Sequence, residues 1–95
     1  MFDRRQSDLL DWDDRALRKI AGHRVEPEEV EDVVYSPRHL AMRLGSNRYL
    51  VYGQSASGRY LKVVLDTREG RRFRPVTAYD MDEADRRLYH RKVRG

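Results

Sequence analysis

Apolar residues along this chain follow two different spacings, and the spacing changes at Pro37. Before Pro37 they repeat at i, i+3 and i+4, which predicts two short amphipathic helices. The apolar stripes are Leu17, Ile20 and Ala21 in the first helix and Val30, Val33 and Val34 in the second. Asp13 or Asp14 can cap the start of the first helix and Gly22 can end it, while Pro27 suits the first turn of the second.

After Pro37 apolar and polar residues alternate, which predicts β-strands. The alternation covers four segments, 40–44, 49–52, 61–65 and 73–79. The short connections at 45–47, 55–58 and 67–70 each contain a glycine, as hairpin turns often do, so consecutive strands are expected to pair antiparallel. Pro75 cannot donate a hydrogen bond to a neighbouring strand and is expected at an edge or a bulge.

A third helix is predicted near the C-terminal end, and the apolar residues at 9–12 can add an edge strand. Asp80 and Glu83 have the spacing of a helix-capping pair, and the residues after them run from acidic to basic, as the helix dipole favours. The expected buried stripe of this helix is Met81, Ala84 and Leu88. The elements predict one α+β domain over residues 1–95, with two N-terminal helices, an antiparallel meander of about four strands and a C-terminal helix. We expect the helices to pack on one face of the sheet.

Charge divides the chain into two unlike halves. Residues 1–47 hold 8 Lys and Arg against 10 Asp and Glu, a net charge of −2, while residues 48–95 hold 12 against 6, a net charge of +6. A basic strand followed by a basic helix suggests a site for a polyanion. The chain has no apolar run long enough to cross a membrane and no apolar leader, so we expect a cytoplasmic protein without a membrane partner.

Four short segments carry a resemblance to a known family. They are Leu-Asp-Trp-Asp-Asp at 10–14, His-Arg-Val-Glu-Pro-Glu-Glu at 23–29, Arg-Pro-Val-Thr-Ala at 74–78 and Asp-Arg-Arg-Leu-Tyr at 85–89. In this order and spacing they resemble the BrnT-type toxins, a branch of the RelE/ParE superfamily of bacterial toxin-antitoxin proteins. The resemblance implies a RelE-like fold and a growth-inhibiting endoribonuclease that needs no metal and no cofactor. It also implies a cognate antitoxin as partner, of the ribbon-helix-helix, BrnA-like kind, through which alone the chain would meet DNA.

Cleavage of RNA by its own 2′-hydroxyl requires groups that hold the phosphate, neutralise its charge and move protons. The residues expected to do this are Arg74, Asp85, Tyr89 and His23. Those expected to bind RNA around them are Arg59, Arg72, Tyr79, Arg86, Arg87 and Arg91. Arg74 can offer two parallel donors to a phosphate held against Tyr89, and Tyr79 can stack on a base. Histidine is a common proton-transfer residue, but His23 can instead interact with the terminal carbonyl groups of the first helix.

Three positions depart from the family pattern, and they leave other functions open. This chain has Arg24 where the family usually has Gly, Tyr79 where it has Arg, and Asp85 where it has Glu. One alternative is therefore a non-catalytic module of the same fold that binds nucleic acid or protein. Another is a ParE-like inhibitor of a protein target. Zinc chemistry is disfavoured, because the chain has no Cys and its three His are scattered.

Overall fold

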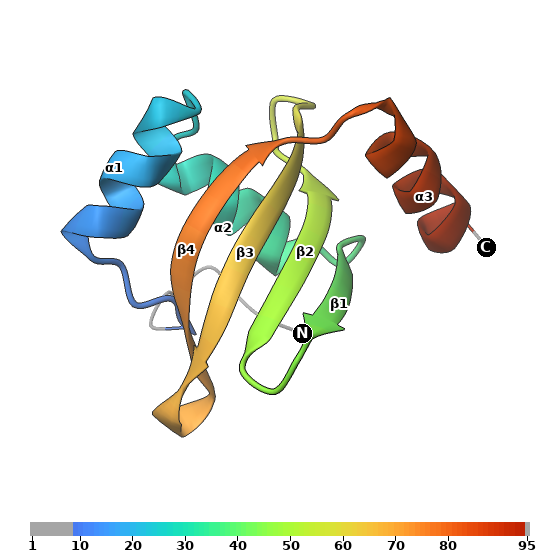
Figure 1. Cartoon of the computed structure of the whole chain (residues 1–95). Coiled ribbons are helices and arrows are strands. Elements are labelled where there is room, and N and C mark those ends of the chain that lie inside the picture. Colours follow the sequence, from blue (N-terminus) through green and yellow to red (C-terminus); the bar gives the residue numbers. More distant parts are fainter. Residues whose placement is uncertain (1–8, 95) are drawn as a thin grey trace.

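The computed structural model describes residues 9–94 and has three helices around a four-stranded antiparallel sheet (Figure 1). The elements are α1 (Asp14–Gly22), α2 (Pro27–Tyr35), β1 (Leu40–Leu44), β2 (Arg48–Gln54), β3 (Tyr60–Arg68), β4 (Arg72–Asp80) and α3 (Glu83–Arg94), with a 3-10 turn, η2 (Glu69–Arg71), between β3 and β4. The sheet order is β1-β2-β3-β4. The predicted α+β class and the meander are confirmed. No helix in the described part of the chain is long and apolar enough to span a membrane.

The ends of the helices differ in part from the sequence prediction. Asp13 caps α1 as expected, because its Oδ1 accepts the Ala16 N–H at 2.8 Å. Gly22 is the last residue of α1 as expected, although the residue in the left-handed conformation just beyond it is Arg24, with φ 59°. The capping pair of α3 is Asp82 with Asp85, each accepting the other's backbone N–H, at 2.8 and 3.0 Å. The predicted capping pair, Asp80 with Glu83, was therefore wrong.

Two predicted apolar stripes need correction as well. In α1 the buried side chains are Ala16 and Ile20, whereas Ala21 is exposed. In the C-terminal segment Met81 is buried ahead of α3, Ala84 is exposed, and Tyr89 is the buried residue of the helix. The stripe of α2 is confirmed, since Val30, Val33 and Val34 are all buried.

Strand β4 has a bulge beside Pro75, as predicted, and pairs at one point with the segment before α1. Val64 of β3 pairs with Thr77 but Leu65 pairs with Pro75, so Val76 forms a bulge beside the proline. The segment before α1 adds a single parallel bridge to the outer edge of β4, between Leu10 and Phe73, rather than an extended strand. The Asp11 N–H supports this bridge by donating to the Phe73 carbonyl at 2.7 Å.

The helices lie on both faces of the sheet, so the expectation that they share one face was wrong. One face packs against α1 and α2 around a core that includes Ile20, Val33, Leu61 and Val63. The opposite face packs against α3 through a smaller cluster of Tyr52, Met81 and Tyr89. Because α3 lies beside β1 and β2 and reaches only the start of β3, it leaves β4 and the rest of β3 uncovered on this second face (Figure 1). We call this second face the α3 face.

Candidate functional site

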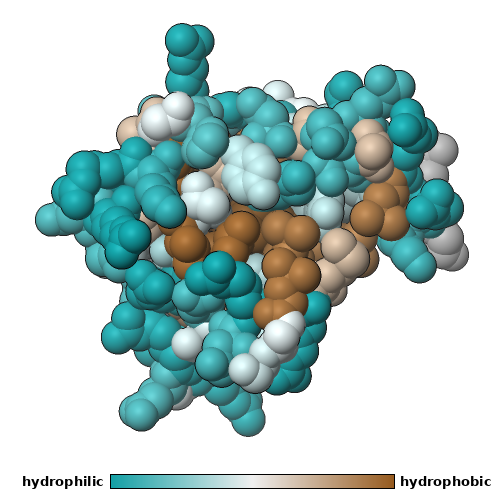
Figure 2. Space-filling view, in the orientation of Figure 1, coloured by the Kyte–Doolittle hydropathy of each residue, from teal (hydrophilic) through white to brown (hydrophobic). Residues whose placement is uncertain are grey.

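Two groups of polar side chains lie on the α3 face, one toward each end of β3. The Lys62 cluster consists of Lys62, Asp85, Tyr52, Tyr79 and His23. The Arg74 cluster consists of Arg48, Asp66, Arg74 and Asp13. Lys62 and Asp66 are four residues apart on β3, so the two clusters are separated by about 13 Å along the strand. Between them Figure 2 shows an apolar band in the middle of this face with hydrophilic side chains on either side.

The Lys62 cluster is assembled by three strands and a helix. Lys62 on β3 pairs with Tyr52 on β2 and with Tyr79 on β4, so the three side chains form one row across the sheet. Asp85 reaches this row from α3. Its Oδ2 lies 2.7 Å from Lys62 Nζ, and its Oδ1 accepts a hydrogen bond from the Tyr52 hydroxyl at 3.4 Å. The start of α3 is thereby tied to the sheet through one carboxylate.

The charges of this cluster are stabilised by one another. Burial opposes the ionised form of Asp85, but hydrogen bonds from Lys62 and the Asp82 N–H bring its pKa below the ordinary value. Burial likewise disfavours the charged form of Lys62, yet the hydrogen bond to Asp85 and the neighbouring charges raise the pKa of Lys62. Burial raises the pKa of Tyr52, and Asp85 adds to this. At neutral pH the cluster therefore holds an ammonium ion, a carboxylate and a neutral phenol.

Tyr79 connects Lys62 to His23. The ring of Tyr79 lies 4.8 Å from Lys62 Nζ, a cation–π contact, and 5.5 Å from the imidazole ring of His23 between centroids. The expected alternative for His23 was an interaction with the terminal carbonyl groups of α1. Only its backbone makes this interaction, because the His23 N–H donates to the Ile20 carbonyl at 3.0 Å. Because His23 is exposed, its imidazole is open to a ligand on this face.

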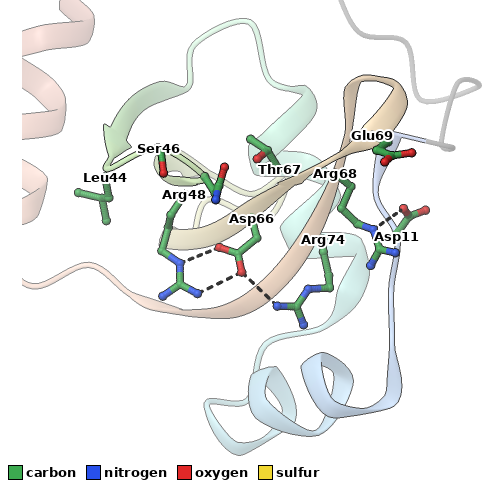
Figure 3. A pocket seen from close by; sticks show the side chains of 10 residues that line it. Asp11, Leu44, Ser46, Arg48, Asp66, Thr67, Arg68, Glu69 and Arg74 are labelled. Carbon is green, nitrogen blue, oxygen red and sulfur yellow. Dashed lines mark hydrogen bonds and ion pairs between the residues drawn. The ribbon is translucent and has the colours of Figure 1, made fainter.

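The Arg74 cluster is organised around Asp66 (Figure 3). Arg48 donates to both carboxylate oxygens of Asp66, at 2.7 and 3.1 Å. Arg74 donates to Asp66 at 3.0 Å and to Asp13 at 3.4 Å. The hydrogen bond from Arg48 is the main reason that the pKa of Asp66 lies below its usual value. The carboxylate therefore stays ionised and holds both guanidinium groups in place.

An open hollow of about 1110 Å³ lies beside this cluster (Figure 3). The ionised residues around it are Arg48, Arg68, Arg74, Asp11, Asp66 and Glu69. Three positive and three negative side chains balance, so the hollow as a whole has no strong preference for an anion.

Arg59, expected to bind RNA, is instead occupied by contacts within the fold. Its guanidinium donates to Asp80 at 2.7 and 3.2 Å, to Glu29 at 3.3 Å, and to the carbonyl groups of His23 and Arg24 at 3.1 and 2.6 Å. A guanidinium has five N–H donors, and five contacts use them all. Arg59 therefore fixes the loop that carries His23 against the end of β4.

Two more of the expected site residues lie away from the Lys62 cluster. Tyr89 is 4% exposed, and its hydroxyl donates to the Arg38 carbonyl at 2.9 Å. It packs in the core under α3, and it does not face Arg74 as the sequence analysis expected. Arg72 forms an ion pair with Asp11 at the outer edge of β4.

The three arginines expected on α3 are exposed. The guanidinium of Arg86 lies 5.6 Å from the centre of the Tyr60 ring, and Arg87 pairs with Glu83 one turn away at 3.1 Å. Arg91 lies near them along a shallow hollow that Tyr60 and His90 also line. These residues form a basic edge of α3 with aromatic rings beside it.

The structure thus brings Asp85, Tyr79 and His23 together and adds Lys62 and Tyr52, which sequence reasoning missed. One signal could have found Lys62: it is the only charged residue within the apolar run 61–65 of a predicted strand. Arg48 and Asp66 were also missed, because their pairing depends on the register between β2 and β3.

Comparison with known proteins does not assign this chain to a family. No protein-family model matches this chain, and no curated protein matches it. Among the described residues, no three His, Asp or Glu side chains are grouped as ligands for a metal ion. The function must therefore be argued from the chemistry of the α3 face.

Proposed function

We propose that this chain is a toxin of the RelE-like, BrnT type, which cleaves single-stranded RNA on the α3 face and is neutralised by a cognate antitoxin. The observation that carries the proposal is the Lys62 cluster. It joins a protonated amine, an imidazole and an aromatic ring where the basic helix α3 meets the sheet. These are the groups that bind a phosphodiester and move protons without a metal ion.

Lys62 has the role of neutralising the charge that develops on the phosphate. Its raised pKa keeps it protonated, and Asp85 fixes its position. Asp85 is accordingly a positioning residue, because its oxygens are already engaged by Lys62, Tyr52 and the Asp82 N–H. Lys62 also supplies a cation beside Tyr79, the position where the family that the sequence resembles has Arg.

His23 and Tyr79 have the proton-transfer roles. The neutral imidazole of His23 takes the proton from the ribose 2′-hydroxyl, whose oxygen then forms a bond to the adjacent phosphorus. The bond from phosphorus to the 5′-oxygen breaks, and that oxygen takes a proton from the Tyr79 hydroxyl. The products are a 2′,3′-cyclic phosphate and a 5′-hydroxyl end. The basic edge of α3, with Arg86, Arg87 and Arg91, attracts the remaining backbone phosphates.

The direct test is incubation of the purified protein with end-labelled single-stranded RNA in the presence of EDTA. Fragments ending in a cyclic phosphate are expected. Lys62→Gln should slow their formation by about 100-fold to 1000-fold, as loss of a charge-stabilising donor does. His23→Asn should slow it by at least about 100-fold. Arg18→Gln removes an exposed charge on α1 away from both clusters and serves as the matched control, with an unchanged rate.

A cellular experiment tests the toxin and its partner. Expression of the chain alone should arrest bacterial growth, expression of the Lys62→Gln variant should not, and co-expression of a neighbouring ribbon-helix-helix frame should relieve the arrest. If the protein binds RNA but leaves it intact, the non-catalytic binding module replaces this proposal. Inhibition of DNA supercoiling without RNA cleavage would replace it with the inhibitor of a protein target.

A further inference from the structure

A small pocket between α1 and β4 has four charged side chains in its lining, and all four are positive. It has a volume of about 240 Å³, and its lining residues are Arg15, Ala16, Lys19, Arg48, Arg74, Pro75 and Val76. Ala16 is 2% exposed, and its small side chain lets α1 lie close to β4 at the Val76 bulge. At about 30 Å³ per water molecule, the pocket can hold a phosphate group with part of its hydration shell.

Two of the four cations come from α1 and form no ion pair within residues 9–94, although Asp13 interacts electrostatically with Arg15. Arg15 and Lys19 are one turn apart, so they project from the same side of the helix. Like charges at this spacing destabilise a helix slightly, and neither side chain forms an ion pair with any residue among 9–94. A bound anion would relieve this repulsion.

The other two cations, Arg48 and Arg74, are held in position by carboxylates and keep further N–H donors for a ligand. Asp66 fixes Arg48 and Arg74 from the sheet side, and Asp13 adds a second contact to Arg74. Each guanidinium has five N–H donors and uses two of them in these contacts. Even when both carboxylates are counted, the pocket keeps two positive charges in excess. Arginines fixed in this way bind an anion with little loss of side-chain entropy.

We propose that this pocket is a phosphate-binding subsite that takes one backbone phosphate of the RNA strand. The identity of the ligand rests on the proposed function, while the anion specificity follows from the four cations alone. The pocket adjoins Arg74, about 13 Å along β3 and β4 from Lys62. The subsite and the Lys62 cluster therefore hold different phosphates of the same strand. Arg15, Lys19 and Arg48 set which phosphate reaches the Lys62 cluster.

The first experiment uses inorganic phosphate as the probe. Titration into the full chain, followed by backbone amide resonances, should give saturable shifts at Ala16, Lys19 and Val76. The double variant Arg15→Gln and Lys19→Gln should lose these shifts, and Arg18→Gln, which removes one positive charge from an α1 side chain that does not line the pocket, should keep them. All three side chains are exposed, so folding is not expected to change. Absence of saturable shifts in the unmodified chain, or shifts that persist in the double variant, would overturn the subsite.

The second experiment separates the subsite from the proposed function. Binding of a single-stranded RNA of about eight nucleotides, a length within the range that small domains cover, is measured at several salt concentrations. The double variant should bind about 10-fold more weakly, with the slope of log affinity against log salt reduced by about 0.7, the value for one lost phosphate contact. RNA cleavage that the double variant leaves unchanged would reject the subsite and keep the enzyme. Phosphate binding in the pocket by a chain that neither binds nor cleaves RNA would keep the anion site and reject the enzyme.

Discussion

The two faces of the sheet are built from alternate residues of the same strands, but they differ in what covers them. On the α1 and α2 face, side chains such as Leu61 and Val63 are fully buried in an apolar core. On the α3 face, the intervening Lys62 and Val64 are only partly buried, because α3 reaches β1, β2 and the start of β3 but not β4. One face therefore carries most of the stability, while the other is free to carry charged groups. Four predictions test this division, from the largest expected effect to the smallest.

Adjacent valines on β3 measure the difference between the faces directly. Val63→Ala removes two methyl groups from a fully buried site and should lower the free energy of unfolding by about 2–3 kcal/mol. Val64→Ala makes the same chemical change on the α3 face, where it should cost less than about 1 kcal/mol. Urea denaturation of both variants gives the comparison. Equal losses would mean that the two faces contribute alike.

A glycine marks how closely α2 approaches the sheet. A Cβ atom at Gly53 would lie 2.9 Å from Val33 Cγ1, closer than such atoms approach. Gly53→Ala should therefore destabilise the fold by about 1–3 kcal/mol through overpacking. Val33→Ala in the same chain should recover part of this loss, because it removes the contacted methyl group. If the two losses simply add in denaturation measurements, close packing at this point is not the cause.

The ion pair on the α3 face should contribute more than an exposed pair on the same helix. A double-mutant cycle of Lys62→Met and Asp85→Asn should give a coupling energy of about 1–2 kcal/mol, since both side chains are more than four-fifths covered. The matched cycle of Arg87→Met and Glu83→Gln, on a largely exposed pair, should give about 0.3–0.5 kcal/mol. Similar coupling in both cycles would show that the Lys62 cluster is no better shielded from solvent than the surface.

The smallest effect expected is a loss of folding stability at low pH. The pKa of Asp85 in the folded state lies below its ordinary value of 3.8, so this carboxylate stabilises the fold fully above that pH. Its contribution is lost as the pH falls through the lowered folded value. Urea midpoints measured from pH 5 downward should thus decline, and Asp85→Asn should decline less steeply. Asp66→Asn should show the same at the other end of the face, because the pKa of Asp66 is lowered as well. A decline identical in all three chains would contradict both assignments.

Arg59 and Tyr89 show why residue type alone misassigned part of the site. Both have side chains that suit RNA, and both lie in the half of the chain with excess positive charge. Yet Arg59 spends its donors on Asp80, Glu29 and two carbonyl groups, and Tyr89 is buried with its hydroxyl bonded to Arg38. Their partners are between 21 and 51 residues distant in sequence, so no local pattern identifies them.

The sequence by itself determined the elements and the order of the strands. Helix and strand periods, helix caps and glycine turns depend on neighbours within a few residues, and short hairpin connections leave consecutive strands little choice but to pair. Tertiary structure decided which face α3 covers and which side chains form the Lys62 cluster. Those outcomes depend on strand register, on the bulge at Val76 and on the direction in which the chain leaves β4 after Asp80. They are set by contacts between segments that are distant in sequence. The spacing of residues along one segment does not show the free energies of these contacts.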